Sequence, residues 1–158
     1  MPLVYLETFI NASPDIVFDL SRSVDLHKES MHHHNEEIID GVRTGLMYLG
    51  DTVTWKAKHF LKSRTLKVKL TEFLYPDFFT DEMIAGDFKK MQHKHEFKSS
   101  AEGTLMIDRF YFETPFGIFG RLINLLFFKT YMTQLLQERN AVIKRIAESE
   151  ERKQFLHP

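Results

Sequence analysis

The fold of this protein is decided by residues 115–151, PFGIFGRLINLLFFKTYMTQLLQERNAVIKRIAESEE, which predict one long helix. This stretch has neither Gly nor Pro after Gly120, and at ~1.5 Å of rise per residue the helix would be roughly 50 Å long. Its apolar residues recur at helical spacing and form one stripe. The stripe consists of Leu125, Phe128, Met132, Leu135, Val142, Ile143 and Ile146. A stripe of this length needs an apolar partner surface.

Residues 3–114 supply that partner, because they are mostly alternating apolar and polar runs separated by turn residues, which is typical of an antiparallel sheet with one covered face. We expect strands at 3–10, 36–48 (broken by Gly41 and Gly45), 52–61, 64–74, 78–85, 88–99 and 104–114, with a hairpin turn at Lys62-Ser63. After the first strand, Ser13 and Pro14 begin a short helix. A second helical segment follows Ser21 to about His34, and its polar composition predicts a surface position. The class is therefore α+β.

The composition fits one globular domain spanning residues 1–158, of which 43% are hydrophobic. Lys and Arg number 21 and Asp and Glu number 22, so the formal net charge is −1. Because there is no global basic field, we expect no nucleic-acid partner. The chain has no cysteine, which excludes disulfides, thiolate metal sites and cysteine nucleophiles.

The sequence also predicts where the protein resides. The N-terminus, MPLVYLETFINASPD, lacks the basic segment and the continuous apolar segment of a signal peptide. The longest apolar run, residues 118–128, is interrupted by Gly120, Arg121 and Asn124 and is too short to span a bilayer. We therefore expect no stable membrane insertion and a cytoplasmic location.

Alternation assigns an inward face to three of the strands. The inward positions are Trp55 and His59 in 52–61, Leu66 and Val68 in 64–74, and Met91, His93, His95 and Phe97 in 88–99. The inner face of the other two long strands is left open. In 78–85 and 104–114 either face is apolar enough to point inward.

Several motifs along the chain resemble the START-like, or SRPBCC, superfamily. They are residues 9–14 (FINASP), 50–55 (GDTVTW), 79–83 (FTDEM), 93–97 (HKHEF) and 115–117 (PFG). The sequence is similar to the bacterial ligand-binding branch of that superfamily, which is also described as polyketide cyclase/dehydrase-like or cell-division-inhibitor-like. The resemblance covers nearly the whole chain.

This resemblance implies a helix-grip fold of the Bet v 1/START-like type. About seven antiparallel strands would curl around the last helix, with two short helices after the first strand and an internal cavity for a small hydrophobic or amphipathic ligand, such as a lipid. It implies no cofactor. Combined with the strand faces, it predicts a cavity lined by Trp55, His59, Leu66, Val68, Met83, Met91, His93, His95, Phe97, Phe110, Phe128, Met132 and Leu135.

The inward histidines are the candidates for chemistry. His59, His93 and His95 can hydrogen-bond an oxygen of a ligand or act as a general base. Asp81 and Asp108 are the acids that can orient them. The alternative is that each imidazole bonds a neighbouring carboxylate or carbonyl and only supports the fold. We favour this structural role, so no residue is assigned as catalytic.

A metal site is a further possibility for the same residues. His93 and His95 share one strand face and can supply two ligands, with His59 or Asp81 as a third. The internal run His32-His33-His34 cannot direct three consecutive side chains at one ion from a regular helix. We expect no metal, because members of the family that the chain resembles generally bind their ligands without one.

Two features of the long helix need partners of their own. Arg139 interrupts the apolar stripe, and Glu82 is a candidate for its ion pair. Phe119, Ile123, Leu126 and Phe127 form a second apolar surface opposite the stripe. A loop or residues 31–49 can cover this surface. Our alternative is that it forms a homodimer contact or a portal through which an apolar ligand enters.

Three functions remain open at this point. The first is binding or transport of a small hydrophobic ligand in the cavity, without catalysis. The second is a cyclase or dehydratase that uses the inward His, Asp and Glu residues. The third is a protein-interaction module whose interior is filled. A cavity with polar groups in its wall favours the first two over the third.

Overall fold

The computed structural model describes residues 3–59, 61–114 and 118–157, and for residues 118–124 it describes the backbone alone. Seven strands and three α-helices make up the described chain. The strands are β1 (Leu3–Ile10), β2 (Glu37–Gly41), β3 (Thr52–His59), β4 (Lys62–Leu74), β5 (Phe78–Ala85), β6 (Lys90–Ser100) and β7 (Gly103–Glu113). The helices are α1 (Pro14–Ser21), α2 (Val24–Ser30) and α3 (Ile118–Ala147), with 3-10 turns η1 (His32–His34) and η2 (Glu150–Gln154).

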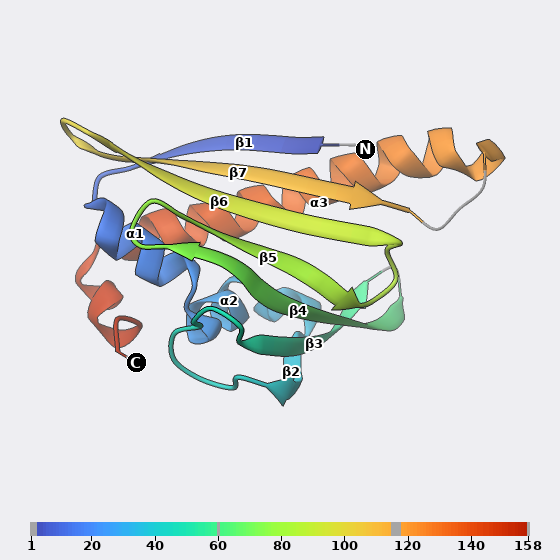
Figure 1. Ribbon diagram of the computed structural model, residues 1–158, viewed down its shortest axis with the longest axis horizontal. Coiled ribbons are helices and arrows are strands. Elements are labelled where there is room, and N and C mark those ends of the chain that lie inside the picture. The colour runs from blue at the N-terminus through green and yellow to red at the C-terminus, as the bar shows by residue number, and fades with distance from the viewer. Residues whose placement is uncertain (1–2, 60, 115–117, 158) are drawn as a thin grey trace.

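All seven strands form one antiparallel sheet in the order β1-β7-β6-β5-β4-β3-β2. From β2 to β7 each strand pairs with the next in sequence, and β1 pairs with β7 at the far edge. The sheet twists across α3, and α1 lies at one end of it (Figure 1). The predicted arrangement of a long C-terminal helix against a seven-stranded sheet, with two short helices after the first strand, is confirmed.

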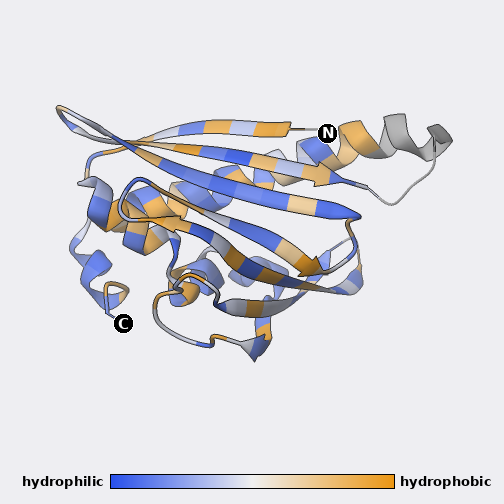
Figure 2. Cartoon of the chain, in the orientation of Figure 1, coloured by the Kyte–Doolittle hydropathy of each residue, from blue (hydrophilic) through white to orange (hydrophobic). Residues whose placement is uncertain are grey.

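Helix α3 packs on the sheet through the predicted stripe. Leu135, Ile143 and Ile146 are buried, and Leu125, Phe128, Met132 and Val142 are partly buried against the same core. Figure 2 shows hydrophilic and hydrophobic residues mixed along the ribbon of α3. The helix ends at Ala147 rather than near Glu151, because Ser149 begins the separate turn η2 and accepts a hydrogen bond from the backbone N–H of Glu151. At ~1.5 Å per residue, α3 is about 45 Å long.

The structure resolves the two strand faces that the sequence left open. On β7 the inner face carries Met106, Asp108, Phe110 and Phe112, all with at most 3% of their surface exposed. On β5 the inner face carries Phe79 and Asp81, because Phe79 is buried at 2% in the core and Asp81 lines an internal cavity.

One end of the interior is solid. The ring of Phe18, from α1, makes edge contacts with Phe73, Tyr75 and Phe79 at centroid distances of 5.0–5.2 Å. Phe97 lies at 5.2 Å on the same ring. Edge-to-face packing of this kind suits the aromatic quadrupoles and leaves little free space. The internal cavity of the described residues lies away from this end, against the middle of α3.

Three of the predicted elements need correction. The hairpin between β3 and β4 does not turn at Lys62-Ser63, because these two residues already pair with His59 and Lys58 in the ladder. Strand β2 ends at Gly41, whose φ of +85° and tight approach to the carbonyl oxygen of Thr52 stop the ladder there. The second helical segment is not a surface element, since Val24 and Leu26 of α2 are each 1% exposed.

Candidate functional site

A cavity of about 260 Å³ lies between the sheet and α3. Its wall is mostly apolar and includes side chains from five strands and from α3. It is lined by Trp55, Ala57, Leu66, Val68, Phe88, Met91, Phe110, Phe128, Met132, Leu135 and Leu136, together with the polar residues described below. The interior formed by the described residues is therefore not filled, whereas the third function considered from the sequence assumes a filled one.

Most of the residues expected around the cavity line it. These are Trp55, His59, Leu66, Val68, Met91, His93, Phe110, Phe128, Met132 and Leu135. Met83, His95 and Phe97 are not among the lining residues. Phe97 belongs to the solid end around Phe18, His95 is covered by the ring of Phe79 stacked at 4.3 Å, and Met83 lies beneath Gly86.

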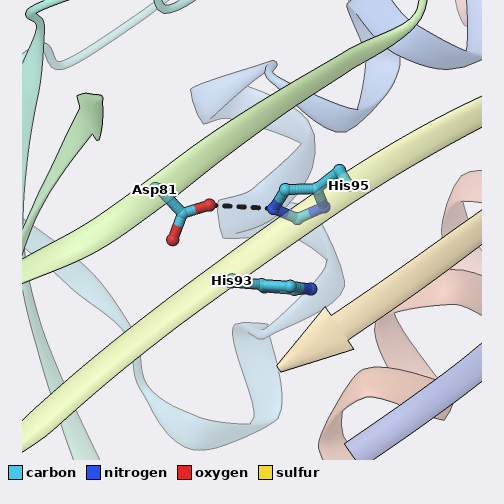
Figure 3. A group of neighbouring side chains, drawn as sticks. All are labelled: Asp81, His93 and His95. Atoms are coloured by element: carbon cyan, nitrogen blue, oxygen red, sulfur yellow. Dashed lines mark hydrogen bonds and ion pairs between the residues drawn. The ribbon is translucent and has the colours of Figure 1, made fainter. Parts of the chain in front are cut away.

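Four of the candidate residues from the sequence, and one from α3, form a buried hydrogen-bonded cluster, called here the His–Asp cluster: Asp81, His93, His95, Asp108 and Arg139. Nε2 of His95 lies 2.8 Å from Oδ2 of Asp81, and Nε2 of His93 lies 2.8 Å from Oδ1 of Asp108. Figure 3 shows the first of these bonds and the two imidazoles side by side on β6. The ring centroids of the two histidines are 3.8 Å apart.

Strand register brings this cluster together. His93 on β6 is the cross-strand partner of Asp81 on β5, and His95 is the partner of Asp108 on β7. Neighbouring residues across an antiparallel ladder have close side chains on the same face. The four residues therefore meet although they lie in three different strands.

The cluster is tied to α3 through Asp108. Arg139 donates to Oδ1 of Asp108 at 3.3 Å, and Asn140 donates to Oδ2 at 2.7 Å. The predicted partner of Arg139, Glu82, instead accepts a hydrogen bond from Gln92 at 2.6 Å. Glu82 follows Asp81 in β5 and so points to the opposite face of the sheet, which puts it out of reach of α3.

Burial and charge set the protonation of the cluster. Burial and the neighbouring His95 lower the pKa of His93 to about 4, against the opposing effect of Asp108. Burial raises the pKa of Asp108, but hydrogen bonds from His93 and His95 and the charge of Arg139 outweigh it and hold that pKa well below its usual range. Burial also acts to raise the pKa of Asp81, but the hydrogen bond from His95 and the nearby charges outweigh it and lower that pKa. Both carboxylates are therefore charged at neutral pH, and His93 is neutral.

Only part of the cluster reaches the cavity. Asp81 and His93 line it, while His95, Asp108 and Arg139 lie behind them. The inner end of an apolar cavity thus presents one carboxylate and one imidazole. Such a pair can accept a hydrogen bond, position a polar group of a ligand, or hold a cation.

A second polar group lies elsewhere in the wall. Nδ1 of His59 is hydrogen-bonded to the hydroxyl of Tyr131 on α3. His27 from α2 packs its ring 4.3 Å from that of Trp55 and bonds Glu36 at 3.1 Å. The sequence predicted His59 but missed His27, Glu36 and Tyr131 as cavity residues. The polar composition of residues 21–36 concealed the first two.

The cavity extends toward the surface beside the ion pair of Arg64 and Asp87. Both residues line it, and their side chains are 36% and 57% exposed. Phe88 follows Asp87 and contacts the ring of Phe128 at 6.2 Å. This region of the wall is therefore the part nearest to solvent.

The second apolar surface of α3 is described in part. Leu126 and Phe127 are 65% and 55% exposed, whereas the side chains of Phe119 and Ile123 lie outside the described residues. The ring of Phe127 lies 6.3 Å from that of Phe128, a cavity residue. A homodimer contact or a portal at this surface remains a prediction.

Solved structures resemble this architecture over nearly its whole length. Protein TTHA0849 from Thermus thermophilus matches with a TM-score of 0.71 and 20% identity, covering 94% of this chain and 100% of that one. The chain has the helix-grip fold. A protein of unknown function from Staphylococcus aureus matches the same fold with a TM-score of 0.69 and 12% identity, over 94% and 96% of the two chains. A major latex-like protein from Panax ginseng matches with 0.67 and 14%, over 94% and 98%.

At 20% identity or less, these similarities establish the fold alone. No protein-family model matches the sequence, and no curated protein matches it. None of the helices among the described residues is both long and apolar enough to cross a membrane. The chemistry of the cavity therefore depends on its own residues.

Loss of Asp108 should destabilise the protein strongly. Asp108→Ala leaves Arg139 buried without its carboxylate, which costs about 3–5 kcal/mol in the free energy of unfolding. Glu82→Ala, in the same sheet but on the opposite face, should cost about 1 kcal/mol or less. Urea denaturation of both variants measures the difference. Equal losses would contradict the account of the cluster, and Asp108→Ala/Arg139→Met should recover part of the stability.

The pKa of the His59 imidazole should lie below its ordinary value of 6.5. Burial, followed by the charge of His34, lowers the pKa of His59 from 6.5. His59 is therefore protonated more readily in the unfolded chain than in the folded one. As the pH falls below 6.5, protonation of His59 lowers the free energy of unfolding. In Tyr131→Phe the neutral ring loses its hydrogen-bond donor, and the pKa should rise toward 6.5. NMR titration of the ring measures both values, and a wild-type pKa at or above 6.5 would contradict the placement.

Proposed function

We propose that the protein binds a small hydrophobic or amphipathic molecule in the cavity between the sheet and α3. The observation that supports this is an internal space of about 260 Å³ whose wall is mostly aromatic and aliphatic and whose inner end carries Asp81 and His93. A space of this kind, apolar with a few converging polar groups, is the usual form of a small-molecule site. The resemblance to the START-like superfamily implies the same function.

The size of the cavity restricts the ligand. Ligand pockets usually measure about 300–1,000 Å³, so a cavity of about 260 Å³ suits a molecule of one or two rings or a short acyl chain. Burial of its apolar surface contributes ~25 cal/mol per Å² before the entropic cost of binding. A long membrane lipid would fit only if the cavity widened.

The polar groups restrict the chemistry of the ligand further. A pure hydrocarbon would leave Asp81 and His93 facing an apolar surface, which costs free energy. A ligand with one hydroxyl, amine or other hydrogen-bonding group at its end satisfies them. The ligand is therefore amphipathic, with its polar group at the inner end.

Proton transfer on the bound ligand is a second candidate function, in the manner of a cyclase or dehydratase. It is supported by the 2.8 Å bond between His93, which lines the cavity, and Asp108 behind it. A base held by a buried carboxylate is a recurring catalytic arrangement. The pKa of His93, about 4, makes it a weak base at neutral pH, so binding without catalysis is the leading proposal.

A cytoplasmic location is part of the same proposal. A binder of small metabolites without cysteine fits the cytoplasm. Cell fractionation with an antibody against the untagged protein tests this directly.

Binding should be measurable with 2-naphthol, an amphipathic probe of suitable size. Ala57 is 7% exposed and lines the cavity from β3, so Ala57→Phe should fill the space and abolish binding. Ala141 lies on the exposed side of α3, and Ala141→Phe is the matched control that should bind as the wild type does. Isothermal titration calorimetry measures both.

Two results would overturn the proposal. One is the same affinity for 2-naphthol in Ala57→Phe and in the wild type, because the probe would then bind elsewhere. The other is no binding by the wild type at millimolar probe. A molecule that copurifies with the wild type but not with Ala57→Phe, detected by native mass spectrometry, would support the proposal and identify the natural ligand.

A further inference from the structure

The side chains of Asp81, His93 and His95 lie close together, the first two in the wall of the cavity and the third behind them. Asp81 projects from β5 toward the two histidines on β6, as Figure 3 shows. One ligand atom from each of Asp81, His93 and His95 lies within 4.8 Å of the other two. All three come from paired strands rather than from loops, so the sheet holds their backbones in place.

We propose that Asp81, His93 and His95 bind one divalent first-row transition-metal ion, such as Zn²⁺, at the inner end of the cavity. Two imidazoles and one carboxylate form a donor set typical of zinc and non-haem iron(II). Family resemblance alone led to the expectation of no metal, whereas the geometry of the cluster favours one.

Oδ1 of Asp108 lies 2.8 Å from Nε2 of His93 and 3.3 Å from Nδ1 of His95. If His93 donates to Asp108, its Nδ1 is left for an ion. Nδ1 of His95 accepts from Arg139 at 3.3 Å, so an ion at Nε2 of His95 would displace the ring proton to Nδ1, which would then donate to Asp108 instead of accepting from Arg139. Metal-binding histidines usually donate their other N–H to a carboxylate or carbonyl, which fixes the tautomer and ring orientation.

The distances allow an ion once the side chains shift. Zn–N and Zn–O bonds of about 2.0–2.2 Å place neighbouring ligand atoms roughly 3.3 Å apart in a tetrahedral site. Nε2 of His95 and Oδ2 of Asp81 are 2.8 Å apart, in direct hydrogen-bond contact, so an ion that replaces the shared proton would separate them slightly. All three ligand atoms lie within 4.8 Å of one another, so binding requires adjustment of the side chains.

The charges also favour a cation. An imidazole must be neutral to bind a metal ion, and beside the two neutral rings the cluster then holds the carboxylates of Asp81 and Asp108 against the single guanidinium of Arg139. Arg139 approaches His95 at Nδ1, 3.3 Å away, which is the side of the ring opposite Nε2. It therefore lies behind the proposed ion and does not occupy its place.

The ion would face the cavity. Asp81 and His93 are both part of the cavity wall, so the position not taken by the protein would be directed toward a bound molecule. Three protein ligands with one open position are typical of a metal that binds or activates an oxygen of a ligand. The site does not depend on the proposed ligand, because the metal alone is sufficient to test it.

The competing explanation is that the cluster is complete without an ion. The bonds of His95 to Asp81 and of His93 to Asp108 already give each carboxylate a hydrogen-bond partner. A different alternative is that an added ion binds outside the cluster, at the run His32-His33-His34 in η1. The experiment must separate the cluster from both.

Chelator-treated, dialysed protein should bind one Co²⁺ per chain, detected by its d–d absorption, and Zn²⁺ should displace it. Asp81→Asn and His93→Gln each keep a hydrogen-bonding group while removing a ligand atom, so both should weaken Co²⁺ binding by about 10–100-fold or more. His32→Gln/His33→Gln is the control and should leave the affinity unchanged. Circular dichroism verifies that each variant is folded.

A measurement on the wild type alone covers the case in which a variant fails to fold. Bound Co²⁺ should broaden the NMR signals of residues 79–83 and 91–97 and spare those of residues 32–34. The proposal is overturned if the wild type binds no Co²⁺ at micromolar concentration, if the broadening centres on residues 32–34, or if only His32→Gln/His33→Gln loses binding. Failure here leaves 2-naphthol binding unaffected, so the two proposals are tested separately.

Discussion

The buried bond between Arg139 on α3 and Asp108 on β7 is the contact on which the rest of the interior depends. It joins the second half of the long helix to the inner face of the sheet, and Asn140 reinforces it by donating to the same carboxylate. Asn140 also donates to Thr8 on β1. Breaking a buried charge pair costs several kcal/mol, so this contact fixes the position of α3 over the sheet. A helix held only by its apolar stripe could shift along the sheet, because apolar packing does not fix its position in this way.

This polar contact divides two kinds of interior. On one side, the rings of Phe18, Phe79 and Phe97 pack closely under α1. On the other side, the helix is held at a distance from β3 and β4, and the space between them remains as the cavity. His93 and His95 mark the boundary, since the first lines the cavity and the second is stacked on Phe79. The same cluster thus positions the helix and supplies the polar end of the candidate site.

The sequence predicted the elements well because local periodicity determines them. Alternation identified the inner face of β3, β4 and β6, and the apolar stripe identified the buried side of α3. The inner faces of β5 and β7 could not be predicted, because both sides of each strand carry apolar residues. Those faces decide whether Asp81 and Asp108 point inward, so the His–Asp cluster could be suspected but not assembled from the sequence. The pairing of Arg139 with Asp108 rather than Glu82 likewise depends on register, which alternation alone does not specify.

The cavity residues that the sequence did not predict were missed for a common reason. His27 and Glu36 lie in a polar stretch typical of a surface segment, yet Val24 and Leu26 of α2 are buried in the core. Tyr131 lies at the edge of the helix stripe, where a half-buried hydroxyl cannot be distinguished from an exposed one without knowing its neighbour His59. Tertiary packing, rather than propensity, determines the role of these residues.

The hollow beside the cluster is tested most directly by diffraction from crystals of the protein pressurised with xenon, since apolar cavities of this size take up the gas. An open cavity predicts an anomalous peak enclosed by Trp55, Phe110 and Phe128. Density showing those side chains in mutual contact, with no xenon between the sheet and α3, would contradict it.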